Sequence, residues 1–512
     1  MSMKVMNIVN FVRVSFVNAQ TAKNFPEKKK DIYETVEKQI KLNKECRIPS
    51  TFLLQYDAIH KSPYRELFLR ERDESIEIGI WFEISRSIVE KVGLKWRGSE
   101  EHDYEWHSDI GYLEGYSTEE REMLVDEAFR MFFEVFGEYP RVVGGWLLDA
   151  HSINYMKEKY DILACCVCRE QHSVDAYTLW GGYYSGGYYP SKRNMLCPAS
   201  TRENQIDVPV FRMLGVDPMY CYDGAKYNKN ISRGPLTLEP FSAHGKNEKI
   251  VDWFFKEYYT NPCLSHSQAT TGQENPFEWA VFGEGYTMQV KKLVDLWKKG
   301  IVSLEKLGDT GKRYKSAFSM TPPSALMALT DWAENGHKTV WYSSKNYRAN
   351  LFLTDDKLLF RDITKFDEGY SDRYHNRRCE TWMAIYDNLP IIDSKLWSSE
   401  DVECGLFFEK SVSDFSVSEK EDCSLEITVY FEDGTSGKIH FDENGIFIEG
   451  CGDMKYITAS LDANTDMTFD GQTFLFVHNG YEYKMPTVAK IQKDTQEYVL
   501  CPVGNVIEFK MH

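Results

Sequence analysis

Four acidic side chains of the chain follow short apolar runs that have the composition of buried strands. They are Asp57, Glu83, Asp149 and Glu274. In α/β proteins the carboxyl ends of parallel strands meet at one face, and ligands bind there. The spacing of the four acids therefore predicts that they gather at an active site.

Each acid alone is equally well explained as the N-cap of the helix that follows its strand. The residues around the acids favour a functional role. Aromatic rings can stack on the apolar faces of sugars, while carboxylate, amide and imidazole groups can bind hydroxyls. The neighbouring side chains of these kinds are Tyr56, Trp81, Trp146, His151, Trp180 and Gln273. This mixture favours a carbohydrate ligand.

Hydrolysis of a glycosidic bond requires two carboxyl groups, one protonated and one acting as nucleophile or base. Asp149 and Glu274 come from well-separated strands, so a barrel could place them across one cleft. We predict that they are the catalytic pair, and that burial beside Trp146 raises the pKa of one of them. The predicted substrate-binding residues are Asp57, Glu83, Trp81, Trp146, His151, Gln273, Tyr56 and Trp180.

Length and charge narrow the class of protein. At 512 residues the chain is too long for one ordinary core. A formal net charge of -18 disfavours nucleic acid as a partner. No apolar run approaches the length of about 18 residues that predicts a membrane span. Twelve cysteines without regular spacing indicate reduced thiols and a cytoplasmic location. The oligomeric state stays open.

Periodicity divides the chain into an α/β part and an antiparallel part. Strand-like runs alternate with helices to about residue 318, which predicts a parallel barrel. Helices are expected at about 27–44, 118–137, 153–160 and 285–307, the last ending at Gly308. We predict a catalytic barrel over residues 1–320, a helical connector over 321–345 with a helix at 325–334, and a β-sandwich-like accessory domain over 346–512.

Three segments resemble motifs of the glycoside hydrolase/polysaccharide deacetylase superfamily. Residues 51–57 are similar to its first motif, residues 77–81 to its second and residues 144–160 to its third. The whole chain resembles an uncharacterised two-domain bacterial family within this superfamily, with Gly-Gln-Glu-Asn-Pro at 272–276. The resemblance implies a distorted parallel (β/α)7-type barrel that acts on glycans.

One departure from the superfamily pattern separates two reactions. Its metal-dependent deacetylases use an aspartate and two histidines, but Trp81 stands where the first histidine is expected. We therefore expect no cofactor and predict a carbohydrate-active hydrolase, a glycoside hydrolase with two catalytic carboxylates. One alternative is a metal-dependent carbohydrate deacetylase in which Asp57 binds a divalent metal with His107, His151 or His244. Another is a catalytically inactive glycan-binding protein.

Overall fold

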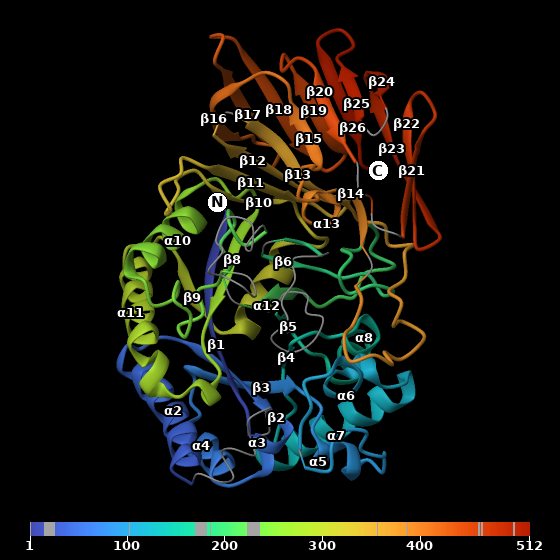
Figure 1. The fold of residues 1–512 in the computed structure, drawn as a ribbon. Coiled ribbons are helices and arrows are strands. Elements are labelled where there is room, and N and C mark those ends of the chain that lie inside the picture. Colours follow the sequence, from blue (N-terminus) through green and yellow to red (C-terminus); the bar gives the residue numbers. More distant parts are fainter. Residues whose placement is uncertain are drawn as a thin grey trace.

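The structure is a computed structural model with two regions, an α/β barrel and a set of antiparallel sheets (Figure 1). It describes residues 2–14, 26–101, 103–168, 182–184, 186–213, 215–222, 236–355, 357–386, 388–458, 461, 464–494 and 497–512. Within this described part, no helix combines the length and the apolarity that crossing a membrane requires.

The barrel is a nearly closed sheet of mostly parallel strands. Its strands follow the order β6-β7-β5-β4-β3-β2-β1-β8, and β9 also pairs with β1. Only the short β6 pairs antiparallel to its neighbour among these described strands. Their bounds are β1 Met3–Val12, β2 Ser50–Gln55, β3 Ile76–Phe82, β4 Val142–Gly145, β5 Ala164–Val167, β6 Gly187–Tyr188, β7 Val210–Arg212, β8 His266–Thr271 and β9 Ser303–Glu305. The predicted fold class is confirmed.

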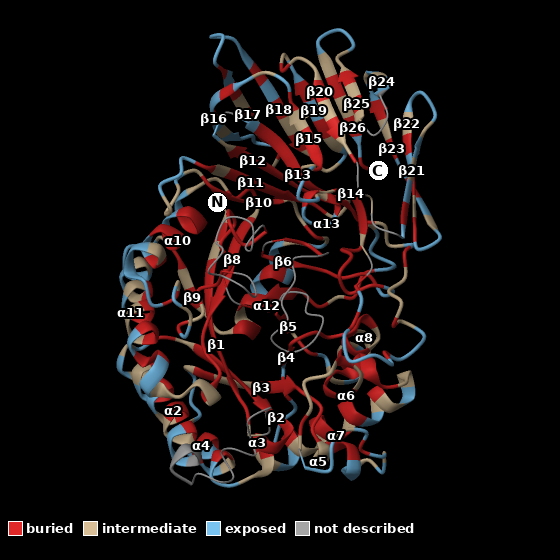
Figure 2. Cartoon of the chain, in the orientation of Figure 1, coloured by how far each residue is buried: buried red, intermediate tan, exposed pale blue. Residues whose placement is uncertain are grey.

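The barrel strands are continuous buried runs because both of their faces are covered. Every residue of β2, β4 and β5 is buried, and Figure 2 shows the barrel strands as buried while the outer faces of the helices are exposed. A parallel strand between a packed interior and a layer of helices has no solvent-facing side, so it carries no polar alternation. This explains why the apolar runs were recognisable in the sequence.

Helices α10, α11 and α2 cover one side of the barrel, and α6, α7 and α8 cover the other (Figure 1). The helices are α2 Pro26–Glu45, α3 Tyr56–His60, α4 Tyr64–Glu71, α5 Arg86–Lys91, α6 Ser108–Gly111, η1 Leu113–Gly115, α7 Thr118–Phe136, α8 Ala150–Tyr160, α10 Glu248–Thr260, η2 Asn275–Phe277, α11 Trp279–Lys298 and α12 Leu307–Ala317. The helices expected at 27–44 and 118–137 are confirmed. A capping box at Ser117 begins α7, and Gly137 ends it with φ 78°.

Two helix predictions are wrong in their limits. The helix expected at 153–160 begins earlier, at Ala150, because Asp149 caps it. The helix expected at 285–307 is α11, which begins at Trp279 and ends at Lys298. Gly300, with φ 69°, follows that end, and the chain then enters strand β9. Of the apolar residues after Gly300, Leu304 lies in this strand and Leu307 begins α12, although their spacing also fits one helix. Gly308, the expected end of the helix, lies in the first turn of α12.

The predicted helix at 325–334 is also wrong. Residues Ser324–Ala328 form strand β10, which pairs antiparallel with β11, Lys338–Ser343. Short apolar runs fit a buried strand as well as a helix, and here pairing with β11 decides for the strand. Residues 324–343 therefore share a sheet with the later strands. The limits of the predicted domains at residues 320 and 346 stay predictions.

Two antiparallel sheets form the sandwich-like C-terminal part, as predicted. One has the order β10-β11-β12-β13-β15-β20-β25-β24 with β14 beside β13, and the other β16-β17-β18-β19-β26-β23-β22-β21. Their remaining elements are β12 Tyr347–Thr354, β13 Lys357–Lys365, β14 Leu389–Asp393, α13 Ser394–Trp397, β15 Gly405–Phe408, β16 Val412–Glu419, β17 Leu425–Phe431, β18 Ser436–Asp442, β19 Gly445–Glu449, β20 Met454–Ile457, β21 Thr465–Phe469, β22 Thr473–His478, β23 Tyr481–Val488, β24 Lys490–Asp494, β25 Glu497–Cys501 and β26 Val506–Lys510.

Buried aromatic contacts join the first antiparallel sheet to the barrel. The rings of Tyr184 and Trp341 stack with centroids 3.6 Å apart. Trp341 Nε1 donates to the carbonyl of Pro218 at 2.8 Å, and Tyr183 Oη donates to Ser324 Oγ at 2.7 Å. The two regions therefore share a packed and hydrogen-bonded interface.

Candidate functional site

Five strands that are neighbours in the barrel each contribute a polar side chain at their carboxyl ends. Arg13 follows β1, Gln55 ends β2, Glu83 follows β3, Trp146 follows β4, and Glu274 lies three residues beyond β8. All five side chains are buried. We call this set the Arg13 network.

Arg13 joins two acids of the network. Its Nε donates to Glu83 Oε2 at 2.8 Å, and its Nη2 lies 2.7 Å from Glu83 Oε1. Its Nη1 bonds to Glu274 Oε2. A guanidinium that holds one carboxylate through two parallel bonds fixes both the distance and the plane of that carboxylate. Glu83 and Glu274 are therefore positioned by one shared cation.

Glu83 accepts two further hydrogen bonds. Trp146 Nε1 donates to its Oε1 at 2.5 Å, and Gln55 Nε2 donates to its Oε2 at 3.1 Å. Burial raises the pKa of Glu83, and the charge of Arg13 and the bond from Trp146 oppose this rise. N–H groups from Arg13, Trp146 and Gln55 all donate to its oxygens and offset part of the effect of burial, but the pKa of Glu83 stays above its ordinary value.

Backbone contacts hold Arg13 and Glu274 in register. The amide of Arg13 donates to Asn275 Oδ1 at 2.7 Å, and Asn275 Nδ2 donates to the carbonyl of Arg13 at 3.1 Å. Gly272 lies against β1, where an added Cβ would stand 1.7 Å from the carbonyl oxygen of Val9. The segment that carries Glu274 therefore approaches β1 more closely than any side chain at position 272 would allow.

Asp149 lies in a second group of ionisable side chains. It caps α8 by accepting from the amide of Ser152 at 3.0 Å, and Ser152 Oγ donates to its other oxygen at 2.6 Å. Arg121 Nη1 donates to Asp149 Oδ1 at 3.0 Å. Burial alone would raise the pKa of Asp149, but Arg121 and Ser152 outweigh it and hold the pKa below its ordinary value. Asp149 is thus both a helix cap and a buried ionised acid.

Arg121 connects this group to the C-terminal half of the chain. Its Nη2 donates to the carbonyls of Glu114 at 3.2 Å and Tyr374 at 3.0 Å. The amide of Cys379 donates to the same Glu114 carbonyl at 2.7 Å. Residues 374–379 are therefore bonded directly to the part of the barrel that holds Asp149.

Glu114 is a buried acid that the sequence did not single out. Among the described residues its Oε1 atom has no hydrogen-bond partner. Burial and then Asp372 raise the pKa of Glu114 well above its ordinary value, Arg121 opposes this, and Asp149 adds to it. Glu114 lies in η1 rather than after a strand, so strand-end spacing gave no signal for it. Two carboxyl groups near Arg121 thus favour opposite protonation states.

The predicted catalytic residues Asp149 and Glu274 occupy different networks. Asp149 bonds to Arg121 and Ser152, whereas Glu274 bonds to Arg13. Trp146, a member of the Arg13 network, precedes Asp149 by three residues and links the two networks along the chain. Their assignment as a catalytic pair stays a prediction.

Two predicted substrate-binding residues are engaged by the protein itself. The buried carboxylate of Asp57 accepts from Ser87 Oγ at 2.5 Å and lies 2.9 Å from Lys61 Nζ. Gln273 Nε2 donates to Glu239 Oε1 at 3.0 Å, and its own Oε1 accepts a backbone amide. These contacts explain the positions of both side chains without a ligand.

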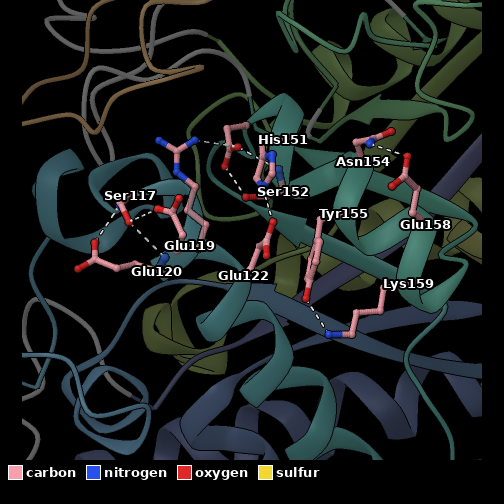
Figure 3. Close-up of polar contacts among 12 residues, drawn as sticks. Ser117, Glu119, Glu120, Glu122, His151, Ser152, Asn154, Tyr155, Glu158 and Lys159 are labelled. Atoms are coloured by element: carbon pink, nitrogen blue, oxygen red, sulfur yellow. Dashed lines mark hydrogen bonds and ion pairs between the residues drawn. The ribbon is translucent and has the colours of Figure 1, made fainter.

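His151 projects from the first turn of α8 toward α7. Figure 3 shows it directed at Glu122, and its Nε2 lies 3.0 Å from Glu122 Oε1. On the same helix, Tyr155 bonds to Lys159 at 2.7 Å (Figure 3). His151 therefore helps to join the two helices, and a contact with substrate stays a prediction.

The predicted aromatic residues mostly pack inside the barrel. Trp81 stacks on Phe11 with centroids 4.5 Å apart, and Tyr56 Oη donates to Glu127 Oε1 at 2.7 Å. Both aromatic residues are buried. Trp180 lies outside the described residues. Packing explains Trp81 and Tyr56, and their contact with a sugar stays a prediction.

The described residues do not fit the metal site of a deacetylase. They contain no group of three or more His, Cys, Asp or Glu side chains that could hold a metal ion. The histidines considered as partners of Asp57 pack elsewhere, since the His107 ring lies beside Trp382 and the His244 ring beside Trp332. Trp81, where the resemblance predicts the first histidine ligand, stacks on Phe11 instead.

Comparisons with known proteins agree with this architecture. Residues 103–319 match the model of a family described as a domain of unknown function with solved-structure structure (DUF3863). No curated protein matches the sequence. A crystal structure from Parabacteroides distasonis, provisionally named a glycoside hydrolase/deacetylase, is similar with a TM-score of 0.55 and 13% identity, over 78% of this chain and 94% of that chain.

Two provisionally named polysaccharide deacetylases, from Mycobacterium smegmatis and Pseudomonas aeruginosa PAO1, have TM-scores of 0.36 at 10% and 13% identity. Each match covers 62% of this chain and 92% of the other chain. At 13% identity, the similarity to the Parabacteroides distasonis structure concerns the fold alone. The predicted resemblance to the glycoside hydrolase/polysaccharide deacetylase barrel is confirmed at the level of the fold, and residues 103–319 match the DUF3863 model.

Proposed function

We propose that the protein is a carbohydrate-active hydrolase, and specifically a glycoside hydrolase that acts through carboxyl groups at the carboxyl end of its barrel. The observation that carries this proposal is the Arg13 network, in which two acids and a guanidinium are buried together with Gln55 and Trp146 at five neighbouring strand ends. Burying ions is costly, and such arrangements with shifted pKa values concentrate at functional sites. The provisional name of the Parabacteroides distasonis structure agrees with a substrate of this class.

The surroundings of each acid suggest its role. Asp149 and Glu274 each meet a guanidinium, which favours the ionised form that serves as nucleophile or base. The proton donor must instead keep its proton near neutral pH, and the surroundings of Glu114 favour this. In this proposal Glu114 gives a proton to the leaving oxygen, and a carboxylate either attacks the anomeric carbon or takes a proton from the attacking water.

Metal-dependent deacetylation receives less support from the side chains. Trp81 stands at the position expected for a metal-binding histidine, and the Asp57 carboxylate is engaged by Ser87 and Lys61. We therefore expect hydrolysis to continue after treatment with a chelator. Loss of activity on chelation, restored by adding back a divalent metal, would favour the deacetylase instead.

The test is turnover of a panel of aryl glycosides and unmodified oligosaccharides by the wild type and Glu274→Gln. This substitution keeps the shape of the side chain but removes its ionisable group. We expect turnover to fall by at least about 100-fold, as for loss of a general acid or base, and melting curves check that the variant is folded at the assay temperature. Glu134→Gln, at an exposed glutamate of α7, is the control and should leave turnover unchanged.

Two outcomes would contradict parts of the proposal. If the wild type releases no sugar from any member of the panel, glycoside hydrolysis is wrong. If Glu274→Gln turns over a substrate as fast as the wild type, Glu274 is not a catalytic residue, and Glu83 is next to be tested. Asp149→Asn and Glu114→Gln should each lose turnover to a similar extent.

A further inference from the structure

Three aromatic rings meet at the surface where the barrel and the C-terminal half come together. The rings of Trp106 and Trp382 have centroids 5.1 Å apart and an interplanar angle of 84°. The ring of His107 lies 4.8 Å from Trp106 and 5.9 Å from Trp382. We call these three residues the aromatic corner. The planes of the two indoles are thus nearly perpendicular.

The outer ring of the aromatic corner is exposed to solvent, although packing favours the burial of a tryptophan side chain. Trp382 is 50% exposed, and the nearby Ile385 is equally exposed. Trp106 packs partly against the barrel core, which leaves Trp382 as the outer ring. No described residue hydrogen-bonds to the indole N–H groups or to the ring nitrogens of His107. The corner thus presents apolar ring faces and unoccupied polar atoms side by side.

Backbone bonds fix the corner beside the group that contains Asp149. The amide of Ser108 donates to the carbonyl of Trp382 at 2.9 Å. Farther along the same segments, the amide of Cys379 donates to the carbonyl of Glu114 at 2.7 Å. The two strips of chain that carry Trp106 and Trp382 are therefore the strips that enclose Glu114. A ligand held at the corner would contact the same two segments that are bonded together at Glu114.

We propose that the aromatic corner is a carbohydrate-binding subsite, which holds a neutral sugar unit beyond the bond that is cleaved. The face of a pyranose ring is apolar, and an indole face of the corner can stack on it. The rim of the pyranose carries hydroxyls, and the ring N–H groups of the corner can donate to them. The backbone carbonyl of Trp382 is already hydrogen-bonded to Ser108, so this indole loses little conformational entropy when a sugar binds. Three rings also cover far less than the roughly 1,200 Å² buried in a stable protein interface, so a sugar fits better than a protein.

This inference rests on the proposed function for the class of ligand, but its test does not require turnover. The wild type, Trp382→Ala and Trp382→Phe are applied to an array of neutral oligosaccharides of microbial, plant and animal types. Trp297→Ala is the matched control, because Trp297 is 41% exposed on α11, on the other side of the barrel. Melting curves check that each variant is folded.

We expect the wild type to bind at least one oligosaccharide class, Trp382→Ala to bind it at least about tenfold more weakly, and Trp382→Phe to retain part of the affinity. Trp297→Ala should bind like the wild type. The subsite is wrong if the wild type binds no oligosaccharide, or if Trp382→Ala binds as well as the wild type. It is also wrong if light scattering shows that the substitution splits an oligomer and leaves sugar binding intact.

The same variants separate failure of the subsite from failure of the proposed function. If oligosaccharides bind through Trp382 but are never cleaved, the subsite stands and hydrolysis is wrong. If an oligosaccharide is cleaved with the same KM by the wild type and Trp382→Ala, hydrolysis stands and the subsite is wrong.

Discussion

Replacing Arg13 by methionine tests whether the Arg13 network is the electrostatic centre of the barrel. The methionine side chain keeps much of the length and packing of the arginine stem but removes the guanidinium. Glu83 and Glu274, which are both buried, would then lose the guanidinium that they share. The substitution should therefore destabilise the barrel strongly at neutral pH.

The magnitude follows from the burial of all three partners. Removing one member of a buried ion pair costs about 3–5 kcal/mol, because the remaining charge is left uncompensated. For a folding unit of barrel size, each kcal/mol lowers Tm by about 2–4 °C. We expect Arg13→Met to lower Tm by about 6–20 °C at pH 7.5.

The loss should depend on pH in a definite direction. Burial already raises the pKa of Glu83, and removing Arg13 takes away the largest influence that lowers it. A glutamate whose pKa is higher in the folded protein than in the unfolded chain costs stability as pH rises above its unfolded pKa of about 4.3. The difference in Tm between the wild type and Arg13→Met should therefore be largest near pH 8 and shrink toward pH 5.

Calorimetric melting curves from pH 5 to pH 8 measure this difference. Arg130→Met is the matched control, because Arg130 also bridges two glutamates, Glu127 and Glu134, but is 42% exposed. An exposed ion pair contributes up to about 1 kcal/mol, so the control should change Tm little. Adding Glu83→Gln to Arg13→Met removes one unpaired charge and should recover part of the loss.

Two results would refute the reasoning. One is a Tm for Arg13→Met that stays within about 2 °C of the wild type at pH 7.5, which would mean that water or rearrangement compensates the two acids. The other is a loss of equal size at pH 5 and pH 8, which would point to packing rather than charge.

Further predictions concern the two segments that hold the remaining acids. Gly272→Ala should lower Tm and turnover together, because the new Cβ would overlap the carbonyl of Val9 at a φ of 148° and displace Glu274; unchanged Tm would contradict this. Glu114→Gln should raise Tm at pH 8 and match the wild type near pH 4.5. Folding favours the protonated form of Glu114, so the stability of the wild type falls as pH rises above the pKa of this group in the unfolded chain. A Glu114→Gln variant that is less stable than the wild type at pH 8 would contradict this prediction.

The barrel was predictable because its strands are buried on both faces and read as apolar runs. The acids at strand ends were recognisable for the same reason, since Glu83 follows β3 and Asp149 follows β4. The structure of residues 321–345 was not predictable in the same way. An apolar run of five residues fits either a helix or a strand until the strand that pairs with it is known. Pairing of β10 with β11 supplied that information, and it comes from residues beyond the run.

Arg13 shows how a residue of the site can be missed. In the sequence it interrupts an apolar segment and reads as the end of a strand. A strand buried on both faces cannot place an arginine at its end without partners, so the charge itself was a signal that an acid must lie nearby. The order of the strands determines which acids lie near Arg13. Strand β1 lies between β2 and β8 in the sheet, and this order brings Arg13 close to Glu83 and Glu274, which are far apart in the chain. Sheet order cannot be read from local patterns.

Glu114 and Asp149 illustrate why acids at one site need structural context to be assigned roles. Strand-end spacing favoured Asp149 and overlooked Glu114, and the sequence predicted that burial beside Trp146 would raise the pKa of one acid of the pair. In the structure, Arg121 bonds to the carboxylate of Asp149 but only to the backbone carbonyl of Glu114. One guanidinium thus stabilises the charge of the first acid and leaves the second to the effect of burial. If the protein is a hydrolase, the difference between its base and its acid therefore depends on which atoms Arg121 contacts.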